Sequence, residues 1–186
     1  MFIQTEQTPN PATLKFIPGC PVLEGGTAEF TQKAEAETHS PLASRLFAIE
    51  GVVGVFLGSD FVTVTRAQNK EWMALKASIL ASIMEHFQSG DPVLHDEGCI
   101  VPSHLNDGEG GEVVTKIKEL LDTRVRPAVA MDGGDINFSS YEDGIVYLQM
   151  RGACAGCPSS TATLKAGIEN LLRHYIPEVR EVRAAS

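Results

Sequence analysis

The sequence predicts an α+β protein built from two small α+β domains that are joined by an acidic linker. Its 186 residues exceed what one small domain needs and suffice for two. Each half pairs a β-hairpin pattern with an amphipathic helix pattern. Residues 89–108 separate the halves and hold four acidic residues but no Lys or Arg. We therefore expect a first domain at 1–88, a linker at 89–108 and a second domain at 109–186.

The first domain shows alternating strand patterns and two helix patterns. Pro9 and Pro11 exclude a helix near the start, and 58–60 form a turn between two β-branched runs. The segment 27–40 is polar, and no element is predicted there. The predicted strands are Phe2–Glu6, Thr13–Ile17, Val52–Leu57 and Phe61–Arg66, and the predicted helices are Pro41–Ile49 and 69–87.

The second domain is predicted to have the order α-β-β-α-β. Pro127 is expected to end its first helix, because proline lacks the N–H that a helix interior needs. Asp132-Gly133-Gly134-Asp135 is read as a turn whose glycines take positive φ. The predicted elements are a helix at Glu112–Val125, strands at Ile136–Tyr141 and Ile145–Met150, a helix at Ser159–His174 and an edge strand at Val179–Val182.

Composition restricts the class of function. The net charge is −9, with 15 basic against 24 acidic residues, and this opposes binding to nucleic acid, which needs a basic surface. No apolar run approaches the roughly 20 residues of a membrane span. The first residues carry neither a basic n-region nor an Arg-rich presequence, so the chain is expected to be cytoplasmic or already processed.

The pair Cys154 and Cys157 dominates the chemistry that the sequence suggests. The pair follows a strand pattern and precedes a helix pattern, so both thiols are predicted to lie at a helix start. The dipole and free N–H groups of a helix N-terminus favour the thiolate, so we expect a lowered cysteine pKa. Gly152 and Gly156 allow close backbone approach, and Pro158 suits the first helical position.

Residue chemistry alone leaves four readings of this pair open. The cysteines are buried apolar residues, ligands of a metal–sulfur cluster, ligands of structural zinc, or a redox dithiol. A thioredoxin-type site needs a longer β-α-β context before the motif, which is missing here. Zinc needs four ligands, and His174 lies roughly 20 Å away along a helix at ~1.5 Å per residue. A dimer supplies four sulfur atoms to either zinc or a cluster.

Other candidate ligands are scattered. His95, Cys99 and His104 lie on the predicted linker and form a weak candidate for a second metal site. Cys20 and Cys99 are isolated, which does not resemble a secreted disulfide framework and favours a reducing compartment. The apolar stripe that includes Trp72 is read as a face packed on a sheet and not as a partner surface.

Two sets of motifs carry a resemblance to a known family. The run Met131 to Asp135, followed by Gly152-Ala153-Cys154-Ala155-Gly156-Cys157-Pro158 and continuing to Lys165, closely resembles the C-terminal domain of NifU-like proteins. The opening Met1 to Glu6, with Thr8-Pro9-Asn10-Pro11 and Leu14 to Gly19, is similar to the N-terminal domain of the Nfu branch. Both halves match in the right order, so the resemblance covers nearly the whole chain.

The resemblance implies an iron–sulfur cluster scaffold or carrier and not an enzyme. It implies that Cys154 and Cys157 bind a [4Fe–4S] cluster at the interface of a homodimer. It also implies transfer to apo iron–sulfur proteins, with upstream cluster-assembly machinery as a further partner. The family occurs in bacterial cytoplasm and in mitochondria; we expect cytoplasm, or the mitochondrial matrix if the chain is processed. Cys20 and Cys99 match no family motif, and the N-terminal domain is expected to recognise partners.

Overall fold

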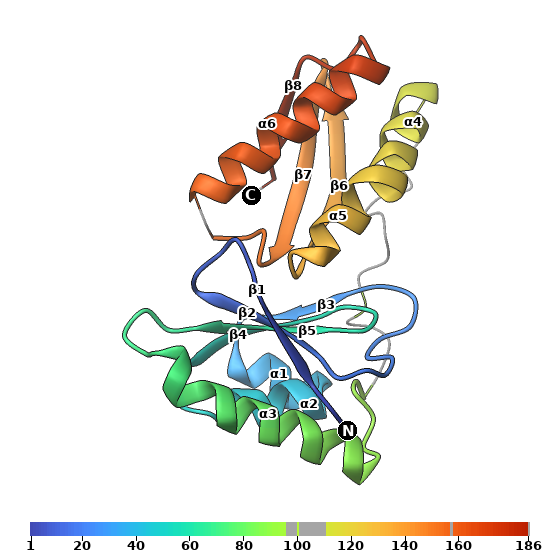
Figure 1. The fold of residues 1–186 in the computed structure, drawn as a ribbon. Coiled ribbons are helices and arrows are strands. Elements are labelled where there is room, and N and C mark those ends of the chain that lie inside the picture. The colour runs from blue at the N-terminus through green and yellow to red at the C-terminus, as the bar shows by residue number, and fades with distance from the viewer. Residues whose placement is uncertain (96–99, 101–110, 157, 186) are drawn as a thin grey trace.

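The protein is an α+β molecule with two separate sheets (Figure 1). The computed structural model describes residues 1–95, 100, 111–156 and 158–185, with the side chains of 158–160 left out. One sheet has five strands in the order β1-β2-β5-β4-β3, and the other has three strands in the order β6-β7-β8. The predicted fold class is confirmed.

The N-terminal part is a five-stranded antiparallel sheet with helices on one face (Figure 1). Side chains at alternate strand positions point to opposite faces, and one set packs against the helices. Leu42, Leu46, Ile79 and Ile83 supply the helical side of this core and are fully buried. The elements are β1 Gln4–Gln7, β2 Thr13–Ile17, β3 Ala28–Phe30, α1 Lys33–His39, α2 Pro41–Phe47, β4 Val52–Leu57, β5 Val62–Arg66 and α3 Trp72–Ser89.

The C-terminal part has the predicted order α-β-β-α-β, with its first helix divided into three segments. β6 and β7 form an antiparallel hairpin, and β8 adds to β7 in parallel. Ile117, Leu121, Ile136, Leu148 and Leu172 lie in its core and are fully buried. The elements are α4 Glu112–Leu120, η2 Leu121–Val125, α5 Arg126–Met131, β6 Gly134–Glu142, β7 Ile145–Gly152, α6 Pro158–Tyr175 and β8 Glu181–Ala184.

The expectation that Pro127 ends a helix is wrong. The helical path continues from α4 through the π-helical turn η2 into α5, which ends at Met131. At the end of η2 the Arg126 N–H bonds to the carbonyl of Leu121, five residues earlier. Pro127 then stands near the start of α5, where its missing N–H removes no bond from a helix interior. A wider turn thus accommodates the proline.

Other expectations differ from the structure by shorter stretches. The polar segment 27–40, for which no element is predicted, contains β3 and α1. The strand expected at Phe2–Glu6 is β1 at Gln4–Gln7, and the helix expected at 69–87 is α3 at Trp72–Ser89. Trp72 is partly buried against the core and donates its Nε1–H to the Pro11 carbonyl at 3.1 Å, so the core reading of that stripe is confirmed.

The second domain rests on the face of the five-stranded sheet that the helices leave open (Figure 1). Its contacting end includes the end of α5 and the turns before β6 and after β7. The residues predicted to form the linker lie largely outside the described residues. Among the described helices, none is both long and apolar enough to cross a membrane.

Candidate functional site

Cys154 lies on the turn between β7 and α6, as the sequence predicts. The turn begins at Gly152, with φ +60°, and Gly156 has φ +77°, so both glycines occupy the left-handed region. The Cys154 N–H donates to the Arg151 carbonyl at 3.3 Å, and Thr161 of α6 donates its hydroxyl to the Cys154 carbonyl at 3.2 Å. The strand and the helix therefore both fix the position of this thiol.

A second turn, at the start of β6, forms a cradle for the Cys154 sulfur. A Cβ built on Gly134 would lie 2.5 Å from Sγ of Cys154 and 2.8 Å from the Arg151 carbonyl oxygen. Gly133 has φ +80°, and its carbonyl accepts the Ala153 N–H at 3.2 Å. The two glycine-containing turns therefore pack backbone against backbone, and only a residue without a side chain fits at 134.

The expected lowering of the thiol pKa is wrong for Cys154. Burial raises the pKa of Cys154 from its ordinary value of 9.0 to about 12, and the negative charges of Asp132 and Asp135 add to the rise. The side chain is 6% exposed and lies four residues before the α6 helix begins at residue 158. Desolvation and nearby carboxylates therefore outweigh the helix dipole, and the thiol is protonated at neutral pH.

Few of the other candidate residues join Cys154 in the described structure. Cys157, Cys99 and His104 lie outside the described residues. Cys20 is a half-exposed free thiol after β2, and the His95 N–H bonds to the His39 carbonyl at 2.8 Å. Among the described residues, no group of three or more His, Cys, Asp or Glu side chains is arranged to hold a metal ion.

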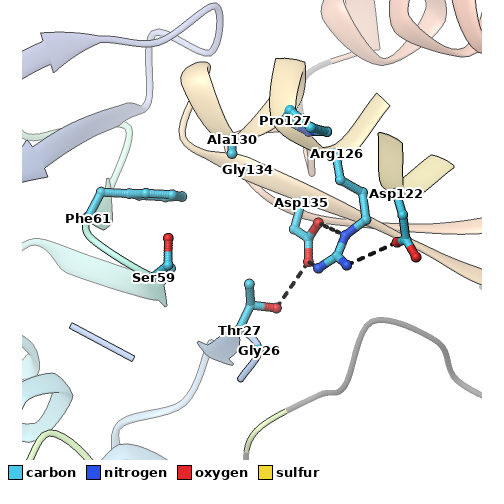
Figure 2. Close-up of a pocket in the computed structure, with 11 residues that line it drawn as sticks. Gly26, Thr27, Ser59, Phe61, Asp122, Arg126, Pro127, Ala130, Gly134 and Asp135 are labelled. Carbon is cyan, nitrogen blue, oxygen red and sulfur yellow. Dashed lines mark hydrogen bonds and ion pairs between the residues drawn. The ribbon is translucent and has the colours of Figure 1, made fainter. Parts of the chain in front are cut away.

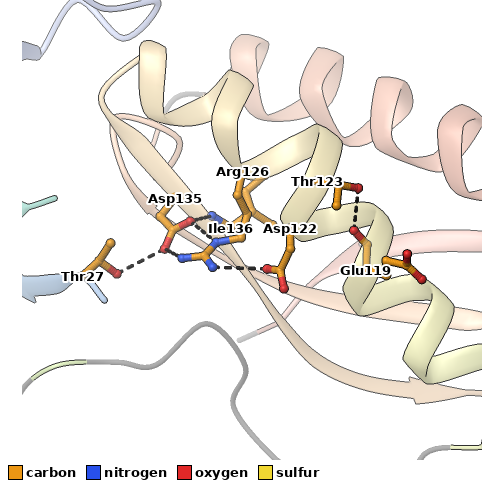
Figure 3. Close-up of polar contacts among 7 residues, drawn as sticks. All are labelled: Thr27, Glu119, Asp122, Thr123, Arg126, Asp135 and Ile136. Carbon is orange, nitrogen blue, oxygen red and sulfur yellow. Dashed lines mark hydrogen bonds and ion pairs between the residues drawn. The ribbon is translucent and has the colours of Figure 1, made fainter. Parts of the chain in front are cut away.

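The sequence does not predict a partly buried ion pair that lies beside the turn. Arg126 donates through Nε to Asp135 at 2.8 Å and through Nη2 at 3.0 Å, and Nη1 reaches Asp122 at 3.2 Å (Figure 3). Asp135 also accepts the Ile136 N–H at 2.9 Å and the Thr27 hydroxyl at 3.2 Å. The bonds to Asp135 and Asp122 raise the pKa of Arg126. The bidentate pair ties α5 to the first residues of β6, and so holds the cradle in place.

A cavity of about 280 Å³ lies between the two domains beside this pair (Figure 2). Ser59 and Phe61 line it from the first domain, and Arg126, Pro127 and Asp135 line it from the second. The guanidinium in its wall is already bonded to two carboxylates. The cavity therefore offers an anion no unpaired charge at Arg126, and the candidate site remains the cysteine turn.

The comparisons with known proteins match both halves of the chain. A family model described as "Scaffold protein Nfu/NifU N terminal" matches residues 3–90, and one described as "NifU-like domain" matches residues 117–183. The human "NFU1 iron-sulfur cluster scaffold homolog, mitochondrial" is 54% identical over 184 residues, covering 98% of this chain and 71% of that protein. The chain belongs to the Nfu family of NifU-like proteins.

Relatives in other organisms match over the same span. The Arabidopsis thaliana "NifU-like protein 4, mitochondrial" is 51% identical, and the match covers 98% of this chain and 65% of that protein. The Drosophila erecta "NFU1 iron-sulfur cluster scaffold homolog, mitochondrial" is 51% identical with 98% and 64% covered. The chain thus spans about two thirds of the length of these relatives.

The raised thiol pKa predicts an unusual pH profile for Cys154. Alkylation by iodoacetamide should accelerate about tenfold per pH unit between pH 7 and 10 without a plateau, because the thiolate fraction keeps rising until the pKa. Mass spectrometry of the Cys154 peptide measures the rate, with N-acetylcysteine as the free-thiol reference. Asp132→Asn should move the curve to lower pH, since it removes a carboxylate that raises this pKa. A plateau near pH 9 in the wild type would contradict the burial argument.

The same shift predicts how stability depends on pH. A thiol whose pKa is higher in the folded chain than in the unfolded chain stabilises the fold at pH values below its unfolded-state pKa. This contribution is lost as the pH rises toward about 12, the pKa in the folded chain. The free energy of unfolding should therefore decline above about pH 9, measured by urea titration. Cys154→Ala should flatten that decline, because it removes the titrating group.

The cradle predicts a sharp difference between two glycines. Gly134→Ala should destabilise the chain by about 1–3 kcal/mol, because its methyl group would overlap Cys154 and the Arg151 carbonyl. Gly167→Ala, in α6 with no atom within 4 Å of the added carbon, should stabilise it by up to about 1 kcal/mol. Chemical denaturation of both variants gives the comparison. Equal effects would show that the close approach at 134 does not limit stability.

Proposed function

We propose that the chain is an iron–sulfur cluster scaffold or carrier that binds a [4Fe–4S] cluster through Cys154 and Cys157. The cluster is bridged between two chains and is then transferred to apo-proteins. The observation that carries the proposal is the position of Cys154 on a fixed strand-to-helix turn at the end of its domain. The family of the chain supports it, since relatives are named as iron–sulfur cluster scaffolds.

Ligand chemistry supports a bridged site. A [4Fe–4S] cluster that is held by cysteine alone needs four thiolates, and the pair gives two per chain. Among the described residues, no group of three or more His, Cys, Asp or Glu side chains is arranged to hold a metal ion beside Cys154. A two-fold axis that brings two cysteine turns together completes the set most simply. A cluster held in this way becomes available to acceptor thiols when the two chains part.

The thiol pKa argues against Cys154 as the attacking thiol of a redox dithiol. A redox cysteine reacts as a thiolate, and such sites lower the pKa of the attacking thiol. Cys154 has the opposite shift, to about 12, which makes it a poor nucleophile at neutral pH. A metal ligand tolerates a raised pKa better, because the bond to iron displaces the proton. Cys154 therefore suits a metal ligand better than an attacking thiol, and we propose no enzymatic activity.

Partners, location and domain division follow from the same proposal. Apo iron–sulfur proteins receive the cluster, and an upstream assembly system supplies it. The relatives are named as mitochondrial, which favours the mitochondrial matrix over bacterial cytoplasm. We retain the division into a Nfu-type domain at 1–88, a linker at 89–108 and a NifU-like domain at 109–186, because the buried residues of the first core end at Ile83 and those of the second begin at Ile117. Val93 and Leu94, at the start of that linker, pack against the first core.

The ligand assignment predicts which cysteines are needed. Anaerobic addition of iron and sulfide should give broad absorption at about 400 nm, typical of thiolate-ligated clusters. Cys154→Ser and Cys157→Ser should each abolish the absorption, whereas the matched variants Cys20→Ser and Cys99→Ser should keep it. Absorption spectra with iron and sulfide analysis measure the outcome. Loss of the cluster in either distal variant would refute the assignment to the pair alone.

The bridged site predicts the stoichiometry. Reconstitution should shift the chain toward a dimer that holds about two irons per chain, because four irons are shared by four thiolates. A cluster that binds only the dimer stabilises it by linkage. Anaerobic size-exclusion chromatography with light scattering, combined with iron analysis, tests this. A species that stays monomeric with about four irons would contradict the bridging.

A further inference from the structure

Five side chains form one row across the open face of the N-terminal sheet. Cross-strand pairing joins Glu6 to Lys15, Lys15 to Thr63, Thr63 to Phe56 and Phe56 to Glu29, so the row crosses all five strands. We call these residues the transverse row. Their neighbours along the strands face the helix-covered core: Leu14, Phe16, Ala28, Phe30, Val55, Leu57, Val62 and Val64.

The lysine of the row binds the end of helix α5 in the other domain. Lys15 Nζ donates to the Ala130 carbonyl at 3.0 Å and to the Met131 carbonyl at 3.1 Å. A lysine there satisfies the last carbonyls of the helix and matches the negative end of its dipole. Lys15 is only 7% exposed, and Glu6 lies 3.5 Å from its ammonium group. Because so little of this side chain is exposed to water, its ammonium group interacts mainly with the protein groups named here.

The middle of the row contacts both glycine-containing turns. Thr63 Oγ1 donates to the Gly133 carbonyl at 2.7 Å, and Glu29 Oε1 accepts the Gly152 N–H at 2.9 Å. A Cβ built on Gly152 would lie 2.9 Å from the Phe56 ring, so the ring packs directly on the turn. Burial raises the pKa of Glu29 in spite of its hydrogen bond, which reflects how closely this contact excludes water.

Two contacts beside the row complete the interface. Asn10 Nδ2 donates to the Ala155 carbonyl at 3.2 Å, next to Cys154, and Thr27 donates to Asp135 at 3.2 Å. The contacts named across this interface are mostly polar, and the cavity of about 280 Å³ lies within it. Polar and incompletely packed contacts are typical of domain interfaces that separate, in contrast to the apolar cores on either side.

We propose that the transverse row is a latch that docks the cysteine turn of its own chain and must release it before a cluster bridges two chains. Glu29 and Phe56 of the row contact Gly152. Asn10, beside the row, binds Ala155, so contacts from the first domain lie on both sides of Cys154. A two-fold cluster site needs the same turn to face the turn of a second copy. The two arrangements therefore exclude each other. The docked contact stands on the geometry, and its link to cluster loading rests on the proposed function.

The test uses the full chain without iron. Thr63→Arg places a long cation where Thr63 meets Gly133 and should open the latch, and Thr38→Arg on the exposed face of α1 is the matched control. Small-angle scattering should give a larger radius of gyration for Thr63→Arg than for the wild type or the control. N-ethylmaleimide should modify Cys154 about tenfold faster in the opened variant, with Cys20 of the same chain as internal reference. Tandem mass spectrometry separates the cysteines.

Each result decides one part of the proposal. An unchanged radius in Thr63→Arg overturns the latch. A larger radius with unchanged Cys154 modification keeps the docking but overturns the covering of the thiol. Circular dichroism checks folding, and if Thr63→Arg unfolds, Lys15→Ala carries the same comparison by removing the bonds to α5. Because these measurements contain no iron, failure of cluster assembly leaves them intact, and failure of the latch leaves cluster binding intact.

Discussion

The close packing of two turns determines most of the site. The turns at 131–135 and 151–155 meet through the Ala153–Gly133 hydrogen bond and through the missing side chain of Gly134. This contact sets the position of Cys154, and the same two turns contact the N-terminal sheet through Gly133 and Gly152. The Arg126–Asp135 pair then fixes the first turn to α5, so that the geometry is held by charge as well as by packing.

Local patterns predicted the elements that depend on local chemistry. The hairpin pattern in each half of the sequence leads to β4–β5 and to β6–β7, because tight turns and strand propensity act over a few residues. The apolar periodicity of α3 and α6 also gave their faces and approximate ends. Cys154 was placed on its strand-to-helix turn by the same means. Motif resemblance, not periodicity, then pointed to its chemistry.

Features that depend on long-range contacts were not predictable. Lys15 and Thr63 look like solvent-facing positions of amphipathic strands, yet the second domain buries both. The thiol pKa rises because residues distant in sequence bury Cys154, whereas the helix-start pattern alone predicts a decrease. The sequence does not predict β3, because the strand has only three residues and one of them is the charged Glu29. The hydrogen-bond partner of Glu29 lies in the other domain. The π-helical turn that accommodates Pro127 has no sequence signature that we recognise.

A latch on the cysteine turn has a thermodynamic consequence for a carrier. If the cluster binds only undocked chains, its apparent affinity falls by the fraction of chains that are open. The docking contacts therefore weaken cluster retention without altering the ligands. After transfer, redocking of the row against Gly133 and Gly152 covers the turn that the cluster has left. A carrier needs both properties, because it must release its cluster and then protect its own thiols.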